Sequence, residues 1–194
     1  MAEESNVHTK LAMAEVLGLY MIALIGILVG CYGLGVFDGL GVIIGVSTYL
    51  GLGLLLCTFV AFWNENILLS GIFGVLGIFL IGFPALVSGA MGAFGDYDSG
   101  MVYMVFIGVL LLVMGLVSLA QPVKMLPVLL IVAAIAFILL GLWFQNDLPN
   151  ATEDYRAATG VLWLLVGLIA TYMGAAISLL VMKGKPVLPL LIKA

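Results

Sequence analysis

Six long apolar runs, separated by polar stretches, restrict this chain more than any other feature of its sequence. A helix that crosses about 30 Å of hydrocarbon needs about 20 residues, and each run reaches that length. With 65% hydrophobic residues, 8% charged residues and a mean hydropathy of +1.36, the chain lies outside the range of soluble domains. The runs cover Val16–Phe37, Leu40–Trp63, Ile67–Gly92, Met101–Ala120, Met125–Phe144 and Thr159–Met182. We therefore predict an all-α integral membrane protein that folds as a six-transmembrane-helix bundle.

The basic residues predict how this bundle is oriented. Cytoplasmic loops retain Lys and Arg, and in a six-helix topology the lysines fall on one side whereas Arg156 alone falls on the other. Those lysines are Lys10, Lys124, Lys183, Lys185 and Lys193. We expect a multi-pass protein of the cell membrane with both termini cytoplasmic. Residues 1–12 and 183–194 are expected to be polar cytoplasmic tails, and 13–182 the transmembrane domain.

Several chemistries have no support in the sequence. There is no Gly-rich phosphate loop, zinc pattern or nucleophile elbow, so we expect neither an enzyme nor a bound metal or cofactor. The single histidine, His8, lies in the polar tail. No basic cluster is present, which excludes a nucleic-acid interface. On the side opposite the lysines, Asn150-Ala151-Thr152 matches the glycosylation acceptor pattern.

A few polar groups inside the apolar runs are candidates for the lining of a solute pathway. Ser47 and Thr58 share one helix face, and Thr48 and Thr171 are further candidates. Hydroxyls in membrane helices also hydrogen-bond the preceding turn of their own backbone, so both interpretations are open. Glu15 stands at the threshold of the first run. It is an interfacial carboxylate or the entrance group that handles a proton.

Glycines recur at helical spacing along the runs. Because helices in lipid associate by close backbone packing, small residues on one face predict helix contacts, within the bundle or between subunits. The positions are Gly26, Gly30, Gly41, Gly45, Gly71, Gly74, Gly77, Gly108, Gly115, Gly160, Gly167 and Gly174.

The layout of short segments resembles one known family. The segments are Leu17-Gly18-Leu19-Tyr20, the Phe37-Asp38-Gly39 turn before a helix with Gly45, the polar turn before Asn66, and GLIATYMGAA at 167–176. Together they are similar to the acetate uptake transporter family, the succinate-acetate permeases. Where that family opens with Asn-Pro-Ala-Pro-Leu-Gly-Leu, this chain has Met-Ala-Glu-Val-Leu-Gly-Leu at 13–19.

The resemblance implies a homohexamer in membrane lipid, with a pathway through each subunit for acetate or similar small monocarboxylates, coupled to protons. It also implies that Ile22, Leu76 and Ala133 form the pathway constriction, and that Ala170 is the small pathway residue of the sixth helix. The aromatic residues that the family places at the constriction are replaced here by Ile22 and Leu76.

Two other functions compete with acetate transport. One is a channel for neutral solutes, resembling the six-helix hexameric urea and amide channels. The absence of histidine from the apolar runs counts against the acid gating of such channels. The other is a membrane protein that assembles partners without transporting a solute, although most of its connections are too short to present much surface.

Overall fold

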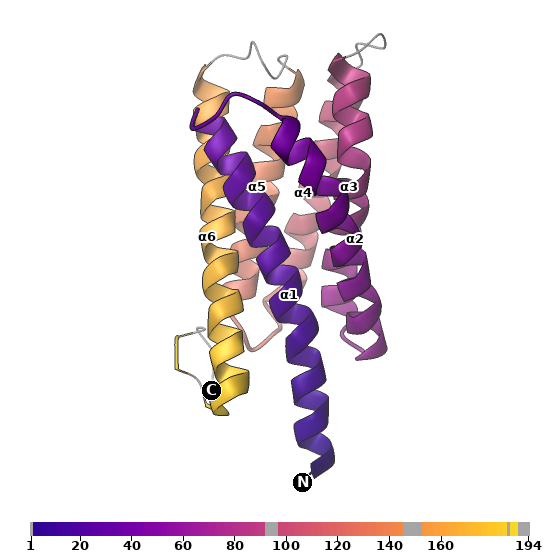
Figure 1. Ribbon diagram of the computed structural model, residues 1–194, viewed down its shortest axis with the longest axis vertical. Coiled ribbons are helices and arrows are strands. Elements are labelled where there is room, and N and C mark those ends of the chain that lie inside the picture. Colours follow the sequence, from indigo (N-terminus) through magenta and orange to yellow (C-terminus); the bar gives the residue numbers. More distant parts are fainter. Residues whose placement is uncertain (1, 92–96, 146–152, 186, 190–194) are drawn as a thin grey trace.

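The computed structural model describes residues 2–91, 97–145, 153–185 and 187–189 (Figure 1). This part of the chain forms α1 (Ala2–Gly33), α2 (Gly41–Trp63), α3 (Ile67–Met91), α4 (Tyr97–Ser118), α5 (Met125–Gln145) and α6 (Glu153–Lys183). Each of the six contains a stretch long and apolar enough to cross a membrane. The prediction of a six-helix membrane protein is therefore confirmed. The glycosylation pattern at 150–152 lies outside the described residues.

Both ends of α1 differ from the expected span. α1 begins at Ala2, so the backbone of the expected tail continues the helix. Glu and Lys are good helix formers even though they are too polar for lipid. α1 ends at Gly33 and not at Phe37, because the amide of Val36 bonds the carbonyl of Cys31 across Gly35. Gly35 has φ +73°, the left-handed conformation that closes such a helix end and that glycine adopts without strain.

The helices form a closed ring in chain order, in which α1 also packs against α6. Three neighbouring pairs pack most closely, α1 with α6, α2 with α3, and α4 with α5, whereas α3 and α4 touch least. The start of α1 and the end of α6 lie at one end of the bundle, here called the terminal end (Figure 1). The α1–α2 connection lies at the opposite, distal end.

Glycines bring the three close pairs together. A Cβ added at Gly26 would lie 2.8 Å from the backbone nitrogen of Gly167, and one added at Gly51 would lie 2.7 Å from the carbonyl oxygen of Gly77. The predicted contact role is confirmed at Gly26, Gly30, Gly77, Gly108, Gly160 and Gly167. It is wrong within this chain for Gly41 and Gly45, where an added Cβ would meet nothing within 4 Å.

An arginine ties α6 to the α1–α2 connection at the distal end. Arg156 donates from Nη2 to the carbonyl oxygen of Tyr32 at 3.2 Å, lies 5.5 Å from the centre of the Tyr32 ring, and pairs with Asp38 at 3.5 Å. Asp38 is 94% exposed, so this ion pair contributes at most about 1 kcal/mol. The sequence placed both residues on this side of the membrane but did not indicate that they meet.

Candidate functional site

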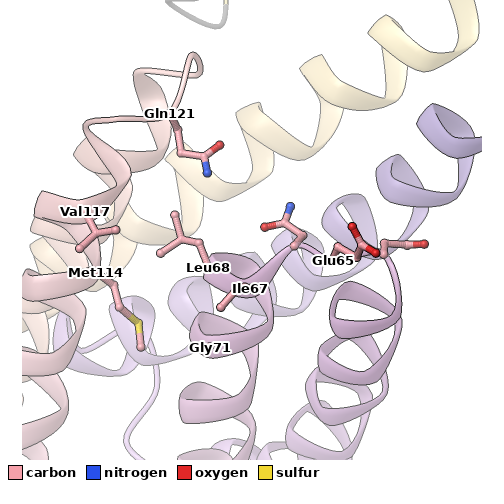
Figure 2. A pocket seen from close by; sticks show the side chains of 9 residues that line it. Glu65, Ile67, Leu68, Gly71, Met114, Val117 and Gln121 are labelled. Atoms are coloured by element: carbon pink, nitrogen blue, oxygen red, sulfur yellow. The ribbon is translucent and has the colours of Figure 1, made fainter. Parts of the chain in front are cut away.

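A hollow at the terminal end opens between the start of α3 and the end of α4, where the ring is least tightly closed. Its volume is about 750 Å³. Figure 2 shows Ile67, Leu68 and Gly71 of α3 on one side of it and Met114, Val117 and Gln121 on the other. Asn66, Leu68 and Gln121 also line the next cavity inward. The hollow and this cavity therefore adjoin at these shared residues.

This next cavity, here called the terminal cavity, holds about 60 Å³ and has a polar rim. Glu15, Asn66 and Gln121 are its polar residues. The amide of Asn66 donates to Oε1 of half-buried Glu15 at 3.2 Å. Glu15, for which the sequence left open an interfacial carboxylate or an entrance group, thus lines a cavity and accepts a hydrogen bond from Asn66.

The α2–α3 turn positions Asn66. Two backbone hydrogen bonds end α2: the amide of Asn66 donates to the carbonyl of Ala61, and the amide of Glu65 donates to the carbonyl of Phe62. These bonds reverse the chain within three residues. Glu65 occupies the left-handed position of this motif, with φ 60°. Asn66 then caps α3, because its Oδ1 accepts from the amide of Leu69 at 3.3 Å. The side-chain amide of Asn66 is left to reach Glu15.

Two enclosed cavities of about 20 Å³ each follow along the axis of the bundle. The middle cavity is lined by Leu19, Ile22, Leu69, Ile72, Phe73, Leu76, Leu111, Leu126, Leu129, Leu130 and Ala133. The distal cavity is lined by Ile22, Ile25, Leu54, Leu76, Phe79, Leu80, Ala133, Phe137, Trp163 and Val166. Leu19, Leu69 and Leu126 also line the terminal cavity, so three cavities succeed one another from the terminal end to the middle of the bundle.

Ile22, Leu76 and Ala133 are the residues that the middle and distal cavities have in common. They come from α1, α3 and α5 and are each 7–8% exposed. The space between the two cavities is therefore bounded by the three side chains that the sequence resemblance named as a constriction. Among the described residues, those shared by the two cavities are all apolar.

Ala170 lies on the α6 face that looks toward these cavities. Val166 lines the distal cavity and Met173 the terminal cavity, and Ala170 falls between them at helical spacing. It is fully buried. Ala170 is not among the described residues that line either cavity.

The hydroxyl residues that the sequence offered as a polar lining are not among the residues that line the three cavities. Ser47 donates to the carbonyl of Ile44 at 2.9 Å, Thr58 to that of Leu54 at 2.9 Å, and Thr171 to that of Gly167 at 2.8 Å. Thr48 is half-buried and Thr171 exposed. Hydroxyl groups in a membrane helix hydrogen-bond the backbone of their own helix in this way because no water is available to them.

Asn66, Gln121 and Trp163 line the cavities but were missed by the sequence reasoning. Asn66 and Gln121 stand directly beside an apolar run, at a predicted helix start and end, which is a signal for residues that face a mouth. Trp163 lies inside an apolar run, where no such signal marks it. Its ring packs at 4.9 Å, edge to face, on Phe137, which packs in the same way on Phe79.

The arrangement of these cavities suits the passage of a solute better than the catalysis of a reaction. Within the described ranges no three His, Cys, Asp or Glu side chains gather as metal ligands do. The cavity series offers polar contact at the terminal end and then an apolar barrier. Such a lining favours small solutes that cross without charge.

Comparison with known proteins identifies the fold. No protein-family model matches the chain, and no curated protein matches it in sequence. It is similar to a solved structure described as the bacterial acetate channel SatP, with a TM-score of 0.80 and 21% identity over 93% of this chain and 98% of that one. That structure is a channel and not an enzyme. The resemblance read from the sequence is thereby confirmed at the level of fold, and the chain is a six-helix, multi-pass membrane protein with the fold of the bacterial acetate channel SatP.

Proposed function

We propose that this chain forms a membrane channel or transporter for acetate and similar small monocarboxylates. The solute passes through a single subunit, from the terminal cavity through the middle cavity to the distal one. The observation that carries the proposal is that two enclosed cavities, in a fold shared with an acetate channel, meet only at Ile22, Leu76 and Ala133. Ala170 gives the solute room on the α6 side.

An apolar constriction favours the protonated acid over the anion. A charged group at the centre of a bilayer costs about 2.5–3.5 kcal/mol even on the lenient insertion scale. In the described part of the chain, neither the middle nor the distal cavity is lined by a Lys or Arg that could offset that cost. A carboxylic acid that titrates near the model value of about 4 brings its own proton, so passage of the neutral acid is a form of proton coupling.

The finer assignments complete the proposal. The terminal end faces the cytoplasm of the cell, as the lysines indicate, and the subunits assemble as a homohexamer in membrane lipid. Glu15 is the entrance group and controls which charge state approaches. The hydroxyls of Ser47, Thr48, Thr58 and Thr171 stabilise their own helices, because three of them already bond a backbone carbonyl.

Proteoliposomes with labelled solutes test the function. We expect uptake of acetate and formate above protein-free vesicles at each pH, and an increase of at least about tenfold between pH 7 and pH 5, because the protonated fraction rises with acidity. Succinate, a dicarboxylate, should enter more slowly. Subtraction of protein-free vesicles is essential, since the neutral acid also crosses lipid.

The same panel distinguishes the competing functions. Urea flux that acetate does not inhibit, without acetate uptake, would identify a channel for neutral amides. If no solute crosses at either pH, the proposal is contradicted. The remaining function is then the assembly of partners without transport.

Removal of the charge at Glu15 should increase acetate uptake at pH 8. Like charges about 4 Å apart repel by about 1 kcal/mol even in water, which corresponds to about fivefold in flux. In Glu15→Gln at low ionic strength we therefore expect uptake about fivefold above the parent, and a smaller difference at high salt, which screens the repulsion. The amide of Gln can still accept the bond from Asn66.

Asp98→Asn is the matched control. Asp98 is exposed at the distal end, where Gln145 donates to it at 2.9 Å, and its neutralisation should leave uptake unchanged. Equal uptake by Glu15→Gln and the parent at low salt would contradict the role of Glu15 as the entrance group. Unchanged pH dependence in the variant would likewise give Glu15 no part in the pH response and would leave the substrate as its own proton carrier.

A further inference from the structure

The hollow at the terminal end and the terminal cavity adjoin at Asn66, Leu68 and Gln121, the described residues that line both of them. Asn66 stands directly before α3, and Gln121 lies in the connection from α4 to α5. Two of the three residues therefore carry a primary amide, and these two come from different sides of the hollow. A solute that moves from the hollow into the terminal cavity passes both amides, here called the amide site.

The amide site presents polar atoms to a solute, in contrast to the cavities farther inside. The wall of the terminal cavity exposes polar atoms, whereas the walls of the middle and distal cavities are apolar. Figure 2 shows the side chain of Gln121 extending from its connection toward the α3 side of the hollow. Polar contact for a solute is therefore concentrated at the terminal end, ahead of the apolar constriction.

The amide of Asn66 is held in one orientation and keeps one donor free. Its Oδ1 accepts from the backbone amide of Leu69 at 3.3 Å, and its Nδ2 donates to Oε1 of Glu15 at 3.2 Å. Both ends of the side-chain amide are thus fixed by the protein. A primary amide carries two N–H donors, and the second N–H of Asn66 has no partner among the described residues.

Gln121 is anchored through its backbone, and its side chain remains available. Its backbone amide donates to the carbonyl of Ser118 at 2.9 Å, and its own carbonyl accepts from Nζ of Lys124 at 2.8 Å. Lys124 also donates to the carbonyl of Leu119 at 2.6 Å, which holds the end of α4 against the connection. Within the described ranges, the side-chain amide of Gln121 has no hydrogen-bond partner. Because Gln121 is exposed, water occupies its amide until a solute replaces that water.

We propose that Asn66 and Gln121 bind the carboxyl group of the solute, with the free N–H of Asn66 and the amide of Gln121 donating to its oxygens. This site rests on the proposed function and names the residues that recognise the substrate at the terminal end. Amides carry no fixed charge, so the carboxyl group can leave again toward the constriction, as conduction requires. Leu19 and Leu69 of the terminal cavity contact the short apolar body of the solute.

Gln121→Leu tests the site, because it removes the free amide and keeps a side chain of similar size. Gln121 is exposed, so the fold should stay intact. We expect the half-saturating acetate concentration for uptake into proteoliposomes at pH 5 to rise roughly fivefold, the effect of one lost hydrogen bond, with maximal uptake within about twofold of the parent.

Asn66→Ser separates the two roles of Asn66. Serine is as good an N-cap residue as asparagine, so α3 keeps its cap, but both amide N–H donors are lost. The half-saturating acetate concentration should again rise roughly fivefold, while the melting temperature in detergent stays at that of the parent. A change in melting temperature without a change in this concentration would assign Asn66 to the fold alone and contradict its part in the site.

Gln145→Leu is the matched control. Gln145 is an exposed glutamine at the end of α5, where it donates to Asp98 at 2.9 Å, and it is not among the described residues that line the hollow or the cavities. Its variant should keep the half-saturating concentration of the parent. An unchanged concentration in Gln121→Leu, or an equal rise in Gln145→Leu, overturns the amide site. Absence of acetate uptake in the parent overturns the proposed function itself, and the two failures are therefore distinct.

Discussion

Acetate uptake should fall at least about tenfold when Ala133 is replaced by phenylalanine. The middle and distal cavities hold only about 20 Å³ each, and Ala133 is the smallest of the three residues between them. A phenyl ring there fills the space that a solute must cross, and a tenfold loss corresponds to about 1.4 kcal/mol. The measurement is initial uptake into proteoliposomes at pH 5, with the amount of reconstituted protein determined in the same vesicles.

Folding must be separated from blockage, because added bulk in a packed core costs about 1–3 kcal/mol. Ile135→Phe adds a ring to the same helix at a residue that is 46% exposed, and it should transport as the parent does. Leu76→Ala changes the constriction in the opposite direction and should admit longer monocarboxylates such as butyrate. If Ala133→Phe folds and takes up acetate at the rate of the parent, the pathway does not pass between these residues.

Valine at Gly26 should destabilise the fold by about 3 kcal/mol, the upper part of the range for overpacked sites. The Cβ would lie 2.8 Å from the backbone nitrogen of Gly167 and 2.9 Å from its Cα, and backbone atoms cannot rotate away. α1 and α6 must then separate along their whole contact. Thermal unfolding in detergent, followed by fluorescence and checked by size exclusion, measures the loss.

Gly45→Val is the control for this substitution. At Gly45 an added Cβ meets nothing within 4 Å, and removal of glycine from a helix interior is favourable by up to about 1 kcal/mol. The subunit should therefore unfold at the same temperature as the parent or slightly above it. A Gly26→Val protein that melts with the parent would mean that the α1–α6 contact does not depend on its glycines.

Much of the fold could be predicted from the sequence because lipid makes one requirement dominant. Apolar length alone identified the six helices, since a backbone in hydrocarbon must satisfy its own hydrogen bonds. The ends were harder to predict. The turn at Gly35 ends α1 at Gly33, although the apolar run continues to Phe37. Likewise, α6 begins at Glu153 although the apolar run starts at Thr159. Hydropathy records where lipid ends, whereas backbone hydrogen bonds decide where a helix ends.

The candidate site was predictable only in its apolar part. The resemblance named Ile22, Leu76 and Ala133 together, although they are far apart in the chain and no spacing rule joins them. The polar part depended on which way a side chain turns. The hydroxyl of Thr58 donates to the backbone of its own helix, whereas the indole N–H of Trp163 has no partner among the described residues. The sequence pattern does not distinguish these two outcomes.

The pairing of α1 with α6 has a consequence for how the protein is made. During synthesis the first helix enters the membrane before its closest partner has been translated, and Gly26 and Gly30 then face lipid or a foreign helix. Because the closest partner of α1 is the sixth helix, the ring can close only after α6 has been inserted. A chain that stops before α6 leaves the glycine surface of α1 without its partner.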